Sequence, residues 1–431
     1  MSIPWVCAWG LAFVLGLGLP RSFLLLDAVL AGSAWLALRR PGPRPSGLLI
    51  WSGLWLLLFG LSYAGFQVGW QVWSPPREHL AEIVAVVLLP AAALAVGWLL
   101  PRFGRSLGSG LILAYASGAL LYVLLSLALS RTPWWNLAQT FVHDVRVPWG
   151  PQQWLNMRSV EQRAFLALAF APVALPLLLR PRQRRPWLAL LLLVLAGLAA
   201  HTAWALQGRI GLGVLGMAAL PWLALVPRRA WRGGLALAVA AAAGAALLSG
   251  RICDERWWLQ ATFLRHLAAA PWGGRLIRFD YRDCRPDVVN HFGSFPGSSA
   301  FSPHNLVLDV YNDAGWLPSL CLLLAVLPLL IRLLIAFGRA FSTLGWDWQL
   351  ALRWSFLSLL VVEWLLQPFL YSDQLMCSIG FVLAGALLAE FNPDSPGGWR
   401  SAMPSHPDTS PPVSGGCSSP AAAPPGGGRP R

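Results

Sequence analysis

Apolar runs of about 20 residues recur along most of this chain, and each is long enough to span a hydrocarbon core of roughly 30 Å. Only helices and closed barrels satisfy their backbone hydrogen bonds inside lipid, and these runs have helical length. Only 12% of the 431 residues are charged, whereas a soluble domain carries roughly 25%. The sequence therefore predicts an all-α polytopic membrane protein and excludes a soluble or secreted one.

We expect twelve transmembrane helices and no cleavable signal peptide. Their predicted ranges are 3–20, 22–38, 48–72, 80–100, 107–130, 163–179, 187–205, 211–226, 231–249, 314–337, 349–371 and 374–390. Residues 1–391 then form a transmembrane domain that includes a large loop at about 250–313. Residues 392–431 are rich in Pro, Gly, Ser and Ala, so they cannot bury a core, and we expect a disordered cytoplasmic tail.

The net charge of +14 comes entirely from arginine, which gathers in five loops on one side of the predicted bundle. The arginines of these loops are Arg39, Arg40 and Arg44; Arg102 and Arg105; Arg180, Arg182, Arg184 and Arg185; Arg228, Arg229 and Arg232; and Arg332 with Arg339. The positive-inside rule makes this side cytoplasmic and places both termini there. This distribution indicates membrane topogenesis rather than nucleic-acid binding.

The most polar part of the chain, residues 249–318, falls on the opposite, periplasmic side and holds seven Arg, seven acidic residues and three of the seven His. Its residues 254–270 have an apolar face at helical spacing and predict an interfacial amphipathic helix. Cys253 and Cys284 either form a disulfide or remain two thiols. The Trp residues at the loop margins are typical of an interfacial aromatic belt, with sugar-stacking platforms as the alternative.

Charged side chains at the ends of the predicted helices are the first candidate functional groups. Arg251 follows a transmembrane helix and precedes an amphipathic one, where it suits a phosphate, or else it reaches a lipid headgroup. Arg209 begins a helix on the outer face, where a charge beside hydrocarbon is costly unless it is paired or functional. Glu363 lies inside the eleventh helix and either pairs with one of these arginines or snorkels to the surface.

A second group of candidates begins at Ser302-Pro303, which resembles an N-cap followed by proline at the first helical position. This reading puts His304 and Asn305 in the first turn of a short helix and Asn305, Asp309 and Asp313 on one face. Leu306, Val310 and Leu317 would form the opposite, apolar stripe. On residue type alone, His304 is either a functional base or a capping or surface residue.

Three motifs in order resemble the bacterial O-antigen ligase and O-antigen polymerase superfamily. His304-Asn305-Leu306 followed by Asp313-Ala314-Gly315-Trp316-Leu317 is similar to the His-Asn-x-x-Leu run that ends in acidic-x-Gly-Leu. Ser249-Gly250-Arg251, with Trp257 and later Pro271-Trp272-Gly273, resembles the Ser-Gly-Arg…Trp…Pro-hydrophobic-Gly run, and Gly208-Arg209 resembles the motif that opens an earlier helix. The chain departs from the pattern at Ile210, Asp313 and Pro318.

The resemblance implies transfer of a glycan from undecaprenyl pyrophosphate to an acceptor hydroxyl at the periplasmic face, without a metal or cofactor. It puts the functional His on His304 and the two important arginines on Arg209 and Arg251. Asn305 and Asp309 would orient His304 or bind the sugar. The acceptor is lipid A core, another lipid-linked repeat or a protein, and the motifs favour the ligase reaction on lipid A core.

Two other classes of function stay open at this stage. A transporter or flippase of lipid-linked glycans would carry charges deep in several helices and some internal repeat, whereas here the charges lie in outer loops. A structural membrane scaffold would not depend on His304, Arg209 or Arg251.

Overall fold

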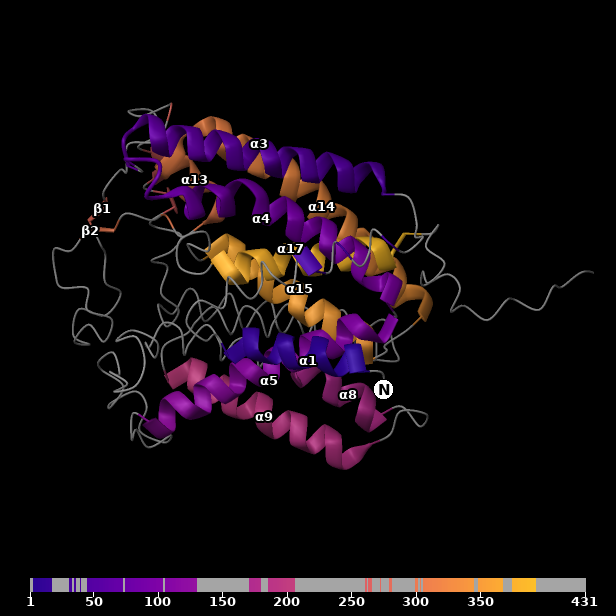
Figure 1. Ribbon diagram of the computed structural model, residues 1–431. Helices are drawn as coiled ribbons and strands as arrows, with labels where there is room; N and C mark the ends of the chain where they lie inside the picture. Colours follow the sequence, from indigo (N-terminus) through magenta and orange to yellow (C-terminus); the bar gives the residue numbers. More distant parts are fainter. Residues whose placement is uncertain are drawn as a thin grey trace, which may run out of the picture.

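The computed structural model of this protein is a bundle of α-helices, with one short β pair at the end of the bundle where α13 lies (Figure 1). In that pair, β1 (Phe279–Asp280) runs antiparallel to β2 (Ser299–Ala300). The structure describes residues 3–17, 31–32, 35, 39, 45–72, 74–103, 105–129, 170–179, 185–205, 260–261, 263–265, 272, 279–280, 299–300, 303, 305–344, 348–366 and 374–392.

The predicted all-α class is confirmed for the described residues, and most predicted helix ends lie within a few residues of the observed ones. The helices are α1 (Ile3–Leu17), α3 (Gly47–Gly69), α4 (Leu80–Leu99), the short 3-10 helix η1 (Leu100–Phe103), α5 (Arg105–Leu129), α8 (Ala171–Leu179), α9 (Pro186–Ala205), α13 (Leu306–Ala314), α14 (Trp316–Leu344), α15 (Trp348–Leu366) and α17 (Gln374–Glu390). The predicted helices 211–226 and 231–249, most of 22–38, and the tail from 393 onward lie outside the described residues.

The largest correction to a helix boundary concerns α14, which we expected to end at 337 and which continues to Leu344. The buried face continues past Gly338 to Ala340, which is 5% exposed and belongs to the same core as Phe337. The Phe337 ring itself lies 5.4 Å from that of Trp354 and 5.0 Å from that of Phe391. Glycine and arginine at 338–339 are common at helix ends, but here tertiary contacts override that local signal.

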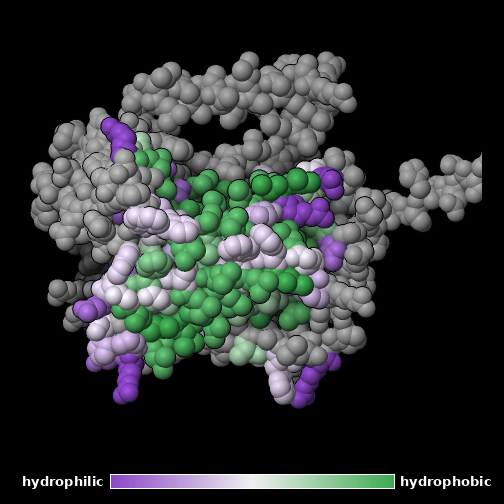
Figure 2. Space-filling view, turned by 90° about the horizontal axis from the view of Figure 1, so that it is seen from above, coloured by the Kyte–Doolittle hydropathy of each residue, from purple (hydrophilic) through white to green (hydrophobic). Residues whose placement is uncertain are grey.

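Four helices among the described residues are long and apolar enough to cross a membrane: Gly47–Gly69, Glu82–Leu99, Gly108–Leu125 and Trp316–Ala340. Shorter apolar helices cover Pro186–Thr202, Trp348–Val362 and Ser378–Glu390. Large apolar side chains are exposed along these helices, and Figure 2 shows an apolar band across one face with hydrophilic side chains gathered toward its two ends. This pattern is typical of a bundle surrounded by lipid.

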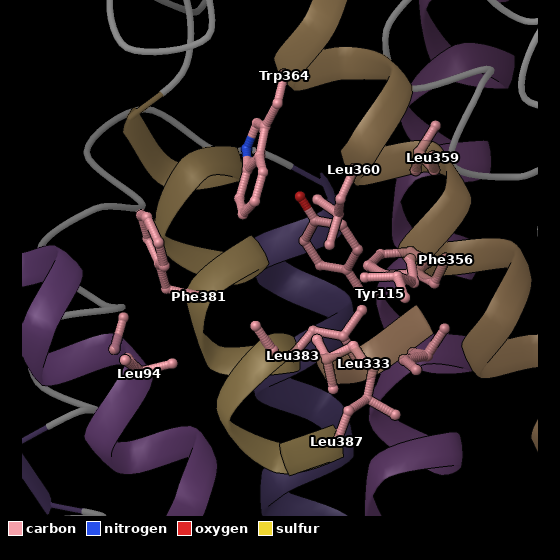
Figure 3. Close-up of a cluster of buried hydrophobic side chains, with 14 of the residues drawn as sticks. Leu94, Tyr115, Leu333, Phe356, Leu359, Leu360, Trp364, Phe381, Leu383 and Leu387 are labelled. Atoms are coloured by element: carbon pink, nitrogen blue, oxygen red, sulfur yellow. The ribbon is translucent and has the colours of Figure 1, made fainter. Parts of the chain in front are cut away.

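The helices pack around a continuous apolar core to which α4, α5, α14, α15 and α17 contribute (Figure 3). Trp364 of α15 packs on Phe381 of α17, with ring centroids 5.5 Å apart. Tyr115 of α5 meets Phe356 of α15 edge to face at 6.1 Å. These aromatic pairs join helices that are more than 200 residues apart in some cases, so the core depends on contacts that are distant in sequence.

At two helix crossings, each helix contributes a glycine that lies against the backbone of the other helix. At the crossing of α4 with α17, a Cβ atom on Gly385 would lie 2.9 Å from the Trp98 nitrogen, and one on Gly97 would lie 3.0 Å from the Ala386 nitrogen. Gly16 and Gly118 make the same reciprocal arrangement where α1 crosses α5. Since lipid is as apolar as the helices, association relies on close van der Waals approach, which small residues permit.

Candidate functional site

The short helix α13 is built by its own sequence at one end of the bundle. The Asn305 side chain caps it, because its Oδ1 accepts hydrogen bonds from the backbone N–H groups of Val307 at 3.1 Å and Leu308 at 3.3 Å. Leu306, Val310 and Ala314 are buried at one-turn spacing. The predicted start was therefore wrong: the helix begins three residues after Pro303, and Asn305 is its N-cap rather than a first-turn residue.

Gly315 ends α13 and lets the chain turn into α14. Its φ of 91° is a conformation that glycine adopts readily, and a Cβ atom there would meet the Trp272 carbonyl oxygen at 2.7 Å. The Trp316 N–H donates to the same carbonyl at 3.2 Å. Because of this break, Leu317 belongs to α14, where its side chain is exposed, and it does not join the apolar stripe of α13 that we predicted.

The acidic face of α13 is turned toward the interior. Asp309 is only 2% exposed, and Asn312, three residues later in the same helix, is buried as well. Asp313 lies against α3, where Tyr63 Oη donates to its Oδ2 at 3.5 Å and Gln67 Nε2 donates to its backbone carbonyl at 3.2 Å. Burial, together with the nearby negative charge of Asp309, raises the pKa of Asp313 to about 8, although the Tyr63 hydrogen bond acts in the opposite direction.

Two side-chain amides attach neighbouring segments to the end of α15: Asn305 attaches the start of α13, and Gln260 attaches the segment around it. Asn305 Nδ2 donates to the Leu365 carbonyl at 3.3 Å, and Gln260 Nε2 donates to the same carbonyl at 3.0 Å. The described residues 260–261 and 263–265 are helical, as predicted for the interfacial helix, and the buried Phe263 ring lies 5.9 Å from that of Tyr311. α3, α13, α15 and the segment around Gln260 therefore meet at a polar junction at this end of the bundle.

Of the predicted site residues, the structure places Asn305 and Asp309 at this junction. Arg209, Arg251 and His304 lie outside the described residues, as do Cys253, Cys284 and the side chain of Glu363. Their predicted roles stay predictions. Within the described ranges, no group of three or more His, Cys, Asp or Glu side chains is arranged to hold a metal ion.

The reading of the sequence missed three residues of the junction: Tyr63, Gln67 and Gln260. A signal existed for each. Tyr63 and Gln67 are polar groups one helical turn apart in an otherwise apolar membrane helix, where polar side chains face protein rather than lipid. Gln260 lies three residues before Phe263, so it interrupts the apolar face of the amphipathic helix.

A second polar contact, also missed, lies at the opposite end of the bundle. Arg353 of α15 and Glu390 of α17 form an ion pair of 2.6 Å between Nη1 and Oε2, with side chains only 3% and 5% exposed. A Cβ on Gly108 of α5 would lie 3.4 Å from the Glu390 carboxylate, so this glycine leaves room for the pair. The pair links α15 to α17 at a buried position, where a single unpaired charge would be strongly destabilising.

No protein-family model matches this chain, and no curated protein matches it either. An assignment of function therefore depends on the motifs of the sequence and on the geometry of the described helices.

Proposed function

We propose that this protein is a lipid-linked glycan transferase of the bacterial inner membrane. It moves a glycan from undecaprenyl pyrophosphate to an acceptor hydroxyl at the periplasmic face, and the leading acceptor is lipid A core. O-antigen polymerisation and protein O-glycosylation are the related reactions that the same site chemistry serves.

The observation that carries this proposal is the local structure of the motif that begins at His304. Its Asn305 is the N-cap of α13 and its Gly315 is the conformational break that ends the helix, so the residues that define the resemblance are the ones that define the element. The buried polar groups Asp309 and Asn312 lie between these two points. Two described residues of the motif, Asn305 and Gly315, thus have defined structural roles, which is better support than a match of letters alone.

The packing of the helix ends agrees with the twelve-helix topology that we propose. The polar junction brings together Tyr63, Asp313 and Leu365, all of which the topology assigns to the periplasmic side. The ion pair of Arg353 and Glu390 lies at ends assigned to the cytoplasmic side. These relative directions of the described helices support the topology that the arginine-rich loops predict.

The proposed reaction is an inverting substitution at the anomeric carbon. The acceptor oxygen forms a bond to that carbon as the bond to the pyrophosphate oxygen breaks, and undecaprenyl pyrophosphate leaves. His304, in its neutral form, takes the proton of the attacking hydroxyl. Arg209 and Arg251 bind the pyrophosphate and stabilise the negative charge that grows on it as it leaves.

Lipopolysaccharide profiling of a deletion strain tests the proposal and separates the acceptors. Loss of all long chains with accumulation of lipid-linked polymer indicates a ligase, and chains of a single repeat indicate a polymerase. Unchanged lipopolysaccharide with loss of a glycoprotein indicates the protein-directed reaction. A deletion strain in which all three products are normal would refute a role in glycan transfer.

Complementation with point variants then tests the assigned residues. We expect His304→Ala, Arg209→Ala and Arg251→Ala to abolish the product at normal protein level. Arg265→Ala is the matched control, because Arg265 belongs to the same polar stretch and its side chain is exposed. If all three variants restore the wild-type glycan profile, the mechanism is wrong.

A further inference from the structure

Two side-chain amides converge on one backbone carbonyl at the end of α15. Leu365 is the penultimate residue of that helix, where carbonyl groups lack partners within the helix. Gln260 and Asn305 both donate to it, at 3.0 Å and 3.3 Å, and a carbonyl oxygen has two lone pairs to receive them. One acceptor thus joins two segments that are 45 residues apart (305 − 260).

The orientation of the Asn305 amide is fixed from both sides. Its oxygen accepts from two N–H groups of the first turn of α13, and its nitrogen donates to Leu365. Both lone pairs of the oxygen are therefore used, so a substrate hydroxyl finds no acceptor left on this side chain. Asn305 therefore links two helix ends, and the sugar-binding role that the resemblance implies for it stays a prediction.

Gln260 attaches a third segment, the helical residues 260–261 and 263–265, to the same carbonyl of Leu365. Its side chain is 9% exposed, and the helical segment that carries it reaches α13 again through Phe263, which is fully buried against Tyr311. The segment is thus attached to the end of α15 by a hydrogen bond and to the middle of α13 by aromatic packing. Loss of the Gln260 hydrogen bond would weaken the attachment of this segment to the end of α15 but leave the Asn305 cap of α13 in place.

We propose that Asn305 and Gln260 are positioning residues, which fix the start of α13, directly after His304 in the sequence, through the shared carbonyl of Leu365. The inference rests on the proposed function, in which His304 takes a proton from the acceptor. A general base must lie within hydrogen-bond distance of the proton that it removes, so a small displacement of the base lowers the rate of the reaction.

The test uses the full-length protein in lipid nanodiscs and three variants. Gln260→Met keeps the length of the side chain and removes the donor, and Asn305→Ser keeps a capping oxygen and removes the donor to Leu365. Gln67→Met is the matched control, because Gln67 is also a buried amide that donates to a backbone carbonyl, at 3.2 Å, but it holds the far end of α13. Unfolding temperatures of all three are measured first.

Two readouts follow. The first is transfer from a synthetic undecaprenyl-pyrophosphate-linked oligosaccharide to lipid A core, for which we expect kcat to fall about tenfold in Gln260→Met and Asn305→Ser with KM little changed. The second is NMR titration of histidine-labelled protein, with His304→Gln identifying the signal. We expect the His304 signal to shift in both variants and to stay at its wild-type position in Gln67→Met.

The outcomes separate this inference from the proposed function. A His304 signal that moves in both variants, in a wild-type protein that transfers no glycan to lipid A core, supports the positioning and overturns the ligase reaction. A wild-type protein that transfers glycan, with kcat and the His304 signal unchanged in both variants, overturns the positioning alone. Equal effects of Gln67→Met and Gln260→Met would also overturn it, because a general loss of packing would then explain both.

Discussion

The crossing of α4 with α17 offers the sharpest test of how this bundle is held together. The perturbation is Gly385→Ala, which adds one methyl group at the point of closest approach. That Cβ would lie 2.9 Å from the Trp98 nitrogen and 3.1 Å from the Leu94 carbonyl carbon, and closer still to the Leu94 oxygen. These are backbone atoms, which no rotamer change can move, so the helices must separate.

The size of the effect follows from that separation. An ordinary contact of this kind is about 3.4 Å or more, so the helices must part by at least 0.5 Å along the line to Trp98. A gap of roughly 0.5–1 Å removes a quarter to a half of each pairwise attraction of about 0.1–0.2 kcal/mol, and a helix crossing contains tens of such pairs. We therefore expect Gly385→Ala to lose about 1–3 kcal/mol of stability.

The assay is thermal unfolding in detergent micelles, followed by the fluorescence of the 25 Trp residues. Gly338→Ala is the matched control, since Gly338 is a helical glycine with nothing within 4 Å of its added Cβ. The control should gain about 0.4–1 kcal/mol, because alanine restricts the unfolded chain. The reasoning fails if Gly385→Ala unfolds at the same temperature as Gly338→Ala or above it.

Two further predictions concern buried charges. The pKa of Asp313 is about 8 in the folded protein, against a usual value of 3.8, so between these pH values the folded protein keeps a proton that the unfolded chain releases. The free energy of unfolding should therefore fall as the pH rises from about 4 to about 8, by up to about 1.4 kcal/mol per pH unit. Asp313→Asn should flatten this dependence of the unfolding temperature, and an unchanged slope would contradict the assigned burial. Arg353→Leu or Glu390→Leu alone should cost about 3–5 kcal/mol by leaving a buried charge without its counter-ion, whereas the double variant should be close to wild type in the same measurement. A double variant that is as unstable as the sum of the two single ones would show that the pair is not the relevant contact.

The candidate site shows why local patterns located its helix and misjudged its ends. Ser302-Pro303 is a common opening of a helix, but the observed cap is Asn305, whose amide also bonds to Leu365. The choice between two adequate caps depended on a carbonyl that is 60 residues away in sequence. No periodicity within residues 302–314 contains that information.

The same limit explains the groups that the sequence reading missed. Tyr63 and Gln67 lie in an apolar run whose length identifies a membrane helix, and these two polar residues predict only that one face meets protein. That they meet Asp313, 250 residues from Tyr63, is decided by the packing of α3 against α14. Arg353 and Glu390 likewise become a pair only when α15 and α17 come together.

The sequence by itself determined the helical membrane class of this protein, because apolar runs of about twenty residues satisfy their backbone hydrogen bonds in lipid as helices. The direction that the arginine-rich loops indicate stays a prediction. The sequence also predicted a short helix after His304 and its end near Gly315, but not its N-cap, which is Asn305. The tertiary structure alone decided which helices cross at Gly97 and Gly385, the burial of Asp309, the contact of Asp313 with Tyr63, and which carbonyl Gln260 and Asn305 share. These features are set by atoms that are far apart in the chain, and their energies exist only once the helices have packed.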